Sequence, residues 1–116
     1  MSDIIDLHVH SNASDGTFTP SEIVKYAVKK GLRAVALTDH DTTAGVARAM
    51  GAGAKLGLEV VPGIEVSSSY KNHEIHILGL FVDTGSPSLQ AALKEFRQHR
   101  DQRNQEMLKR FDAHGI

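Results

Sequence analysis

The sequence predicts an α/β fold built on a mainly parallel sheet. Short apolar runs that end in polar side chains alternate with helix-like segments that carry capping residues. The run at 33–38 is apolar almost throughout, which is typical of a strand buried on both faces of a parallel sheet. The predicted strands and helices form an open sheet, so we expect the chain to be the N-terminal part of a larger fold.

The composition limits the class of protein. The chain has 116 residues, of which 41% are hydrophobic, enough for one small domain with a buried core. Its net charge of -1 does not indicate nucleic acid or an anionic membrane as a partner. The absence of cysteine excludes disulfides, thiolate zinc sites and a cysteine nucleophile. There is no signal-peptide pattern and no apolar run near the roughly 20 residues of a membrane span, so we expect a soluble, cytoplasmic protein.

The first predicted strand, at 4–10, alternates apolar and polar side chains. Successive strand residues point to opposite faces, so Asp6, His8 and His10 share one face. Two imidazoles two residues apart on a strand can converge on one metal ion. Incidental histidines on a polar strand face are the simpler alternative, and this pattern alone leaves both open.

A polar loop follows and leads into a well-marked helix. Asp15 lies in a turn signal with the glycine after it, and its carboxylate is also close enough in sequence to join the histidine pair. Thr19 is the expected cap, with Pro20 at the first helical position and Glu22 completing a capping box. Gly31 ends the helix. Its apolar stripe is Ile23, Val24, Ala27 and Val28.

The buried strand ends in three successive ionisable residues at 39–41. A helix-capping loop explains one or two of them, since Asp41 or the threonines after it can cap, but it does not explain His40. The second helix is expected from about 43 to 56, with Gly57 as its stop. Three glycines in and before this helix indicate close packing on the sheet.

Two strands at 58–67 and 73–82 form a predicted hairpin, joined by the polar segment between them. A lone strand glutamate such as Glu65 usually faces solvent. A turn centred between residues 70 and 71 places Glu65 directly opposite His76, and a turn centred one residue later makes the two diagonal neighbours. Both registers keep the pair on one face of the hairpin.

The last predicted helix starts at Ser86-Pro87 and ends near Gly115, with Ile116 resembling the start of another strand. Its apolar residues cluster at 89–96 and 107–111. Residues 94–110 hold six Lys/Arg against three Asp/Glu. A solvated helix face explains this composition, and a surface that contacts phosphates is the sharper hypothesis.

Six ionisable side chains at strand ends or adjacent loops stand out. They are His8, His10, Asp15, His40, Glu65 and His76. Residues at consecutive strand ends converge at one rim of an α/β sheet or barrel. Imidazoles and carboxylates suit Zn, Mn or Fe, and six ligands exceed the needs of one tetrahedral ion. We therefore predict two or more divalent ions with Glu65 as a bridge, an arrangement suited to phosphoryl transfer.

Four segments in order, DLHVHSNASDG, ALTDHD, PGIEVSSSY and HEIHILGL, resemble the PHP (polymerase and histidinol phosphatase) superfamily. The likeness is greatest to its nucleoside 3′,5′-bisphosphate phosphatase and 5′-to-3′ exoribonuclease branch. The resemblance covers residues 1–116 and implies the N-terminal part of a distorted (β/α)7 TIM-like barrel with a trinuclear metal site. It implies that His8, His10 and Glu65 hold one ion with Glu65 bridging, that His76 serves a second, and that Asp15 and His40 serve a third.

The resemblance implies a metal-dependent phosphoesterase that hydrolyses phosphate esters with a metal-bound hydroxide. Its cofactors would be two or three Mn, Zn or Fe ions, and its substrate a small phosphorylated molecule or a short RNA. The alternatives are a non-catalytic, self-associating metal-binding module and a plain α/β domain with incidental histidines. Family members have further ligands in two later segments that this chain lacks. We therefore expect fewer bound ions and weak or absent phosphatase activity. We also expect a homodimer formed on the open side of the sheet, with the helix from Ser86 to His114 as the candidate for exchange between chains, because its apolar ends need a surface to cover them.

Overall fold

The computed structural model describes residues 4–115 and has the predicted α/β architecture. Its elements in chain order are β1 (Ile5–Val9), α1 (Pro20–Lys29), β2 (Ala34–Leu37), α2 (Val46–Leu56), β3 (Glu59–Tyr70), β4 (His73–Leu80) and α3 (Pro87–Ala113). The strands lie in the order β1-β2-β3-β4, with the first three parallel and β4 antiparallel to β3. Ile116, expected to start another strand, lies outside the described residues.

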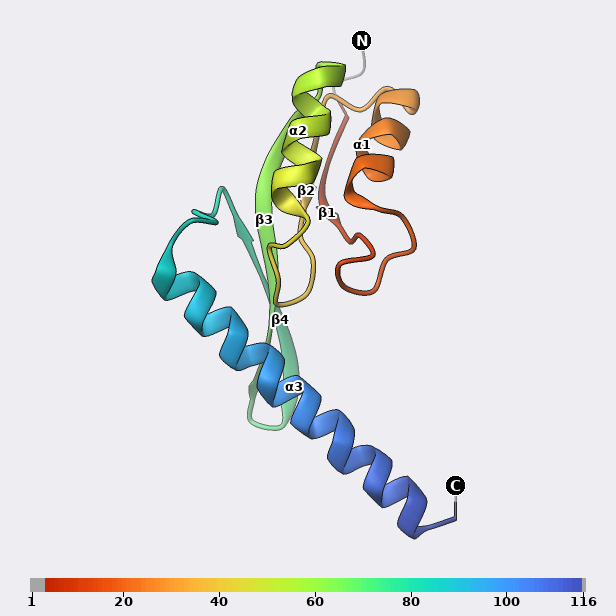
Figure 1. Cartoon of the computed structure of the whole chain (residues 1–116), viewed down its shortest axis with the longest axis vertical. Helices are drawn as coiled ribbons and strands as arrows, with labels where there is room; N and C mark the ends of the chain where they lie inside the picture. The colour runs from red at the N-terminus through yellow and green to blue at the C-terminus, as the bar shows by residue number, and fades with distance from the viewer. Residues whose placement is uncertain (1–3, 116) are drawn as a thin grey trace.

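The core lies between the parallel strands and the two helices that connect them. Each helix connects two neighbouring parallel strands, and Figure 1 shows α1 and α2 side by side on the same face of the sheet. All four residues of β2 are buried, as its continuous apolar sequence predicts. Val35 and Leu37 of β2 join a cluster with Val24 of α1 and Val46 of α2. This packing fixes the carboxyl ends of the strands, where the polar residues lie.

The capping residues predicted for the first helix are confirmed, but two details of the predicted helices are wrong. The capping box of α1 is present, since Thr19 Oγ1 accepts from the backbone of Glu22 at 3.2 Å. Val28, expected in the buried stripe, is instead 39% exposed, whereas Ile23, Val24 and Ala27 are buried as predicted. The second helix begins at Val46 rather than near 43, because the residues before it form a turn in which Val46 N–H donates to Thr43 O at 3.0 Å.

Two of the three glycines expected to pack closely do so. A Cβ at Gly45 would lie 2.7 Å from the Pro20 side chain, and one at Gly53 would lie 2.6 Å from the Leu58 carbonyl oxygen. These contacts show that the amino end of α2 approaches α1, and that its carboxyl end approaches the start of β3. A Cβ at Gly51 would meet nothing within 4 Å, so the packing explanation is wrong for that residue.

The hairpin has the later of the two predicted registers. Strand β3 continues to Tyr70, beyond the predicted end, and the turn is formed by Lys71 and Asn72, with φ of 49° and 66°. Two successive residues at positive φ are typical of the tight turns that suit the twist of a hairpin. Ser67 pairs with His76, so Glu65 and His76 are diagonal neighbours on the same face.

Helix α3 crosses the β3–β4 hairpin and runs away from the parallel part of the sheet (Figure 1). It begins as predicted, with Ser86 Oγ accepting from Leu89 N–H at 3.3 Å. Within the described part of α3, Leu93 is the one buried residue, and the apolar side chains at 107–111 are exposed. No helix of residues 4–115 combines the length and the apolar character needed to cross a membrane.

Candidate metal centre

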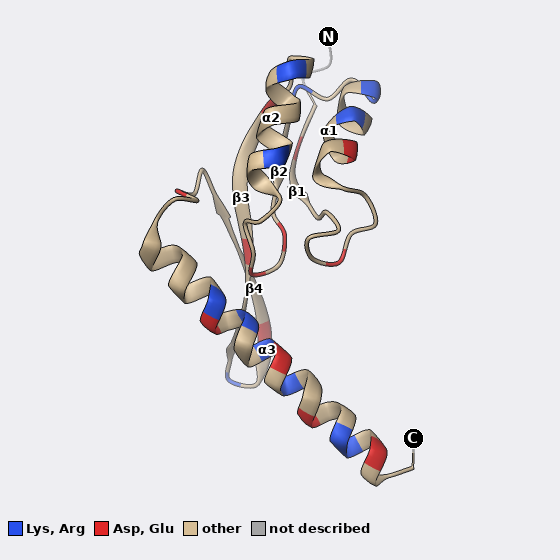
Figure 2. Cartoon of the chain, in the orientation of Figure 1, with Lys and Arg blue, Asp and Glu red and all other residues tan. Residues whose placement is uncertain are grey.

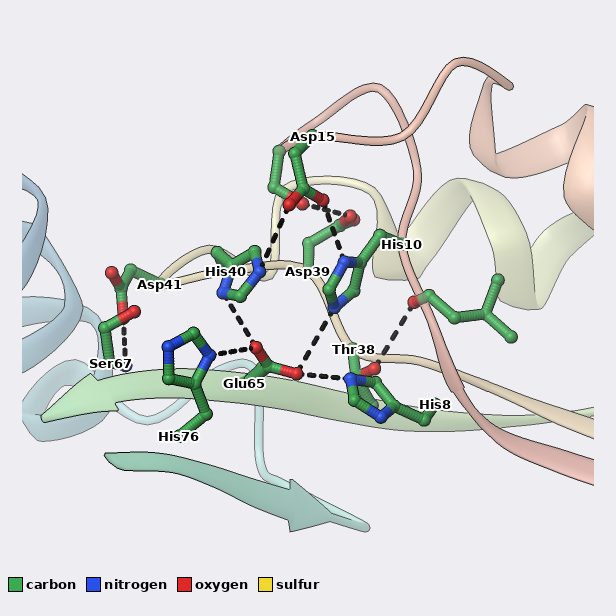
Figure 3. Close-up of polar contacts among 12 residues, drawn as sticks. His8, His10, Asp15, Thr38, Asp39, His40, Asp41, Glu65, Ser67 and His76 are labelled. Atoms are coloured by element: carbon green, nitrogen blue, oxygen red, sulfur yellow. Dashed lines mark hydrogen bonds and ion pairs between the residues drawn. The ribbon is translucent and has the colours of Figure 1, made fainter. Parts of the chain in front are cut away.

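The six predicted side chains lie together at the carboxyl ends of the parallel strands (Figure 3). They form three overlapping groups, and within each group one ligand atom from every residue lies within 4.8 Å of the others. The groups are His8–His10–Glu65, His10–Asp15–His40 and His40–Glu65–His76. The fold therefore brings together residues that are up to 68 positions apart in the sequence.

Glu65 is the centre of this cluster and is 2% exposed, so the expectation that a lone strand glutamate faces solvent is wrong here. Its Oε1 contacts His8 Nε2 and lies 3.4 Å from His10 Nε2. Its Oε2 lies 2.9 Å from His40 Nδ1 and 2.7 Å from His76 Nδ1. One buried carboxylate thus faces four imidazoles from three different segments of the chain.

Asp15 closes the cluster from the solvent side. Its Oδ1 lies 2.8 Å from His10 Nδ1, and its Oδ2 lies 3.2 Å from His40 Nε2. The carboxylate is exposed, whereas the two imidazoles that it joins are largely covered. Asp15 therefore does more than form the turn that its sequence context indicates.

The electrostatics of the cluster favour an ionised Glu65. Burial by itself raises the pKa of Glu65, but the hydrogen bond with His76, the charge of His40 and the contacts of His8 and His10 outweigh it and lower the pKa to about 2. The pKa of His76 is raised by its hydrogen bonds with Glu65 and Glu74. An ionised, buried carboxylate is a suitable bridging ligand.

Two buried ring nitrogens that lack a hydrogen-bond partner show whether the cluster fits a metal ion. His10 Nε2 and His40 Nδ1 are buried and form no hydrogen bond with any part of the chain that the structure describes. Both lie close to Glu65 oxygens, but without the directionality of a hydrogen bond. A buried polar nitrogen without a partner is costly, and coordination to an ion removes that cost. The donor set fits Zn, Mn or Fe.

Asp39 supports the cluster and was not singled out as a site residue from the sequence. It is 1% exposed and accepts hydrogen bonds from Ser11 N–H at 2.6 Å, from Ser11 Oγ at 2.6 Å and from Ser14 Oγ at 2.7 Å. These bonds fix the loop that carries Asp15 against the end of β2. The sequence feature that could have identified Asp39 is its position, directly after the last residues of a fully buried strand.

Asp41 connects the loop after β2 to both β3 and α3. Its Oδ1 accepts from Ser67 N–H at 3.1 Å, and its Oδ2 lies 3.0 Å from Arg100 Nη2. Its carbonyl oxygen accepts from Arg97 Nη1 at 2.7 Å. The suggestion that Asp41 caps α2 is therefore wrong, because its carboxylate is turned toward other elements.

A cleft of about 420 Å³ opens beside the imidazoles. The cluster contributes Asp15, His40 and His76 to its wall, and α3 contributes Arg97 and Arg100. The basic segment of α3 thus reaches the candidate metal centre. A phosphate in this cleft would lie next to both the candidate ligands and two guanidinium groups.

The sequence matches the family model of the PHP domain over residues 6–113. The chain belongs to the PHP family. This confirms the family that the four motifs indicate, and the six candidate ligands all lie within the matched range.

Two relatives show which PHP proteins are similar. The chain is 44% identical over 112 residues to a 3′,5′-nucleoside bisphosphate phosphatase of Chromobacterium violaceum. It is 41% identical over 115 residues to the 5′-3′ exoribonuclease Rnm of Escherichia coli. Each comparison covers 97% of this chain and 39% of the relative, so the chain spans about two fifths of the length of these proteins.

Two solved structures have the same arrangement of elements. An amidohydrolase from Chromobacterium violaceum, solved with sulfate and no metal, superposes with a TM-score of 0.89 at 44% identity, covering 97% of this chain and 39% of that one. A protein from Bifidobacterium adolescentis, proposed to be a metal-dependent phosphoesterase, gives 0.88 at 33% identity, covering 97% and 40%. The curled sheet is therefore part of a TIM-like barrel of the PHP type, as predicted.

Proposed function

We propose that the protein is a metal-dependent phosphoesterase of the PHP family, and that this chain forms the N-terminal part of its barrel. The observation that carries the proposal is the convergence of four imidazoles and two carboxylates beside a cleft lined by arginines. Multi-metal sites of this composition suit the hydrolysis of phosphate esters. The names of the two relatives favour nucleotides or short RNA as the substrate class.

The proposed ligand assignment follows the three groups of the cluster. His8 and His10 would hold one ion with Glu65, and His76 would hold a second with the same carboxylate. Asp15 and His40 would hold a third ion, and His10 lies close to both. The central, buried position of Glu65 supports its proposed role as a shared ligand.

The chain's own residues bind and orient the substrate. Bound Zn, Mn or Fe ions would polarise the phosphate and activate a water nucleophile near neutral pH. Arg97 and Arg100 line the cleft and supply donors for the phosphate oxygens, while Asp39 holds the loop of Asp15 in place. Ligands from the rest of the barrel are expected to complete the coordination.

Metal content and phosphate release test the proposal. Elemental analysis after gel filtration is expected to find Mn, Zn or Fe in this chain, at fewer equivalents than in a full-length protein. Glu65→Gln is expected to remove most of the metal, because the bridge loses its charge, and Glu59→Gln, on the exposed start of the same strand, is the matched control. A chain without bound metal, and without thermal stabilisation on adding these ions, would contradict the proposal.

A phosphate-release assay with Mn²⁺ separates catalysis from metal binding alone. The substrates are adenosine 3′,5′-bisphosphate and a short 5′-phosphorylated RNA. We expect a full-length protein to release phosphate and this chain to do so weakly or not at all. Metal binding without turnover in the full-length protein would instead favour a non-catalytic metal-binding module.

We also propose that the chain as given forms a homodimer. Apolar side chains on β4 and on the end of α3 are exposed, and within the described residues β4 pairs with β3 alone.

A further inference from the structure

A groove of about 370 Å³ lies between α1 and α2, away from the six candidate ligands. Its wall contains two residues of α1 and several of α2, among them Ser21, Lys25, Arg48, Gly51, Lys55 and Leu56. Arg48, Gly51 and Lys55 are three and four residues apart, so they share one face of α2. We refer to this space as the helix groove.

The helix groove carries positive charge that the fold does not balance. Lys25, Arg48 and Lys55 are exposed, and within residues 4–115 their side chains form neither a hydrogen bond nor an ion pair. The acidic residue of α1, Glu22, is engaged in the capping box, where its Oε1 accepts from Thr19 N–H at 3.4 Å. The sequence of α2 contains no acidic residue, and Figure 2 shows basic residues on both helices. The groove therefore attracts an anionic partner, although the net charge of the chain is -1.

Gly51 has no role that the packing of the chain explains. Glycine in the interior of a helix is destabilising relative to alanine, yet a Cβ at Gly51 would meet nothing within 4 Å. Because Gly51 lines the helix groove, a side chain at this position would project into the open space of the groove. The absence of a side chain allows the backbone of an occupant to approach α2 closely.

The character of the wall favours an acidic protein segment over RNA. Leu56 is 44% exposed at the end of α2 and offers an apolar contact beside the cations. Carboxylates form charge-assisted hydrogen bonds with lysine and arginine. In the part of the chain that the structure describes, the wall has no aromatic side chain on which bases could stack, as they do in single-stranded RNA sites.

The helix groove stays at the surface of a complete barrel, because the helices of a TIM-like barrel form its outer ring. α1 and α2 follow each other in this ring and pack together, with Gly45 at the amino end of α2 against Pro20 of α1. Further strands and helices therefore join on either side of this pair and not between its members. The groove is thus available in the whole protein as well as in this chain.

We propose that the helix groove docks an acidic segment of a partner protein. Carboxylates of the segment pair with Lys25, Arg48 and Lys55, and an apolar side chain of the segment packs on Leu56. The groove shares no residue with the candidate metal centre, so this docking site does not depend on the proposed function. A contact of this size is typical of weak, transient complexes.

Fluorescence anisotropy of the full chain with labelled probes tests the proposal. The probes are a peptide of repeated Glu-Glu-Leu triplets, its Gln-Gln-Leu counterpart and an oligouridylate. We expect the chain to bind the Glu-Glu-Leu peptide in preference to the Gln-Gln-Leu peptide. Lys25→Glu and Arg48→Glu should each weaken this binding about tenfold, because each replaces an attraction with a repulsion.

Gly51→Leu separates docking from stability. It should weaken binding of the Glu-Glu-Leu peptide by about tenfold or more, because the new side chain fills the groove. Urea denaturation should show a stability no lower than that of the unmodified chain, because leucine favours a helix and the position is open. Full affinity of the Gly51→Leu variant for the peptide would overturn the proposal.

Arg110→Glu is the matched control, because Arg110 is an exposed arginine of α3 outside the helix groove. It should leave the affinity for the Glu-Glu-Leu peptide unchanged, and an equal loss in this variant would show that the peptide responds to net charge alone and would overturn the proposal. Failure to bind the peptide, or equal binding of the Gln-Gln-Leu peptide, would also overturn it. Oligouridylate binding that Arg48→Glu weakens as strongly as peptide binding would show an RNA surface instead.

Discussion

The guanidinium group of Arg100 lies 3.0 Å from the buried carboxylate of Asp41, and this ion pair attaches α3 to the loop that presents His40. Arg100 Nη2 also donates to Ser67 Oγ at 2.6 Å, so the same side chain reaches β3 two residues beyond Glu65. Asp41 has φ of 54°, a left-handed conformation that is uncommon outside glycine. The pair therefore stabilises a strained backbone beside a candidate ligand.

Arg100→Ala should destabilise the chain by about 2 kcal/mol. Removing one partner of a fully buried ion pair costs roughly 3–5 kcal/mol, and the cost is smaller here because the Arg100 side chain is 31% exposed. Urea denaturation followed by circular dichroism measures the change, with Arg110→Ala as the control. An unfolding midpoint equal to that of the unmodified chain would show that Asp41 is satisfied without Arg100.

Asp39→Asn should lower both stability and metal affinity. An amide of the same shape carries no charge, so the hydrogen bonds that Ser11 and Ser14 donate lose their charge assistance, at a cost of about 1.5–3 kcal/mol. The loop that carries Asp15 would then be held less firmly. Thermal denaturation and Mn²⁺ titration measure the two effects, and Asp112→Asn on the exposed end of α3 is the control. An unchanged Mn²⁺ affinity would show that the hydrogen bonds of Asp39 to this loop do not support metal binding.

The two glycines of α2 give a matched pair of substitutions. Gly53→Ala should destabilise the chain by about 1–3 kcal/mol, because its Cβ would lie 2.6 Å from both the Leu58 carbonyl oxygen and the Val60 side chain. Gly51→Ala should stabilise it by up to about 1 kcal/mol, because its Cβ meets nothing within 4 Å and alanine favours a helix. Chemical denaturation of both variants measures the difference. Equal effects would refute the close approach at Gly53.

Local patterns in the sequence predict the fold and most of the candidate cluster. Strand alternation places His8 and His10 on one face, and the buried strand before His40 predicts that it ends at the same rim. Either predicted register kept Glu65 on the same face as His76. The register itself could not be chosen, because the turn uses Lys71 and Asn72 at positive φ, where an Asn-Gly or Asp-Gly pair would have given a clearer signal.

The supporting contacts could not be predicted, because their partners are distant in sequence. Asp39 binds Ser11 across 28 residues, and Asp41 binds Ser67 across 26. Arg97 and Arg100 belong to a helix whose charge composition fits both a solvated face and a phosphate-contacting surface. Only the three-dimensional packing shows that these two arginines turn toward the cleft.

The chain as given should self-associate through the carboxyl-terminal half of α3. Met107, Leu108 and Phe111 are exposed there, with Leu108 at 65%, and the removal of this apolar surface from water favours a two-fold dimer. Leu108→Lys should weaken the dimer at least tenfold, because it places a charge in the contact. Leu56→Lys, at an exposed leucine that ends α2, should leave it unchanged. Sedimentation velocity over micromolar concentrations measures both variants, and a monomer throughout, or equal effects of the two substitutions, would show that α3 does not form the contact.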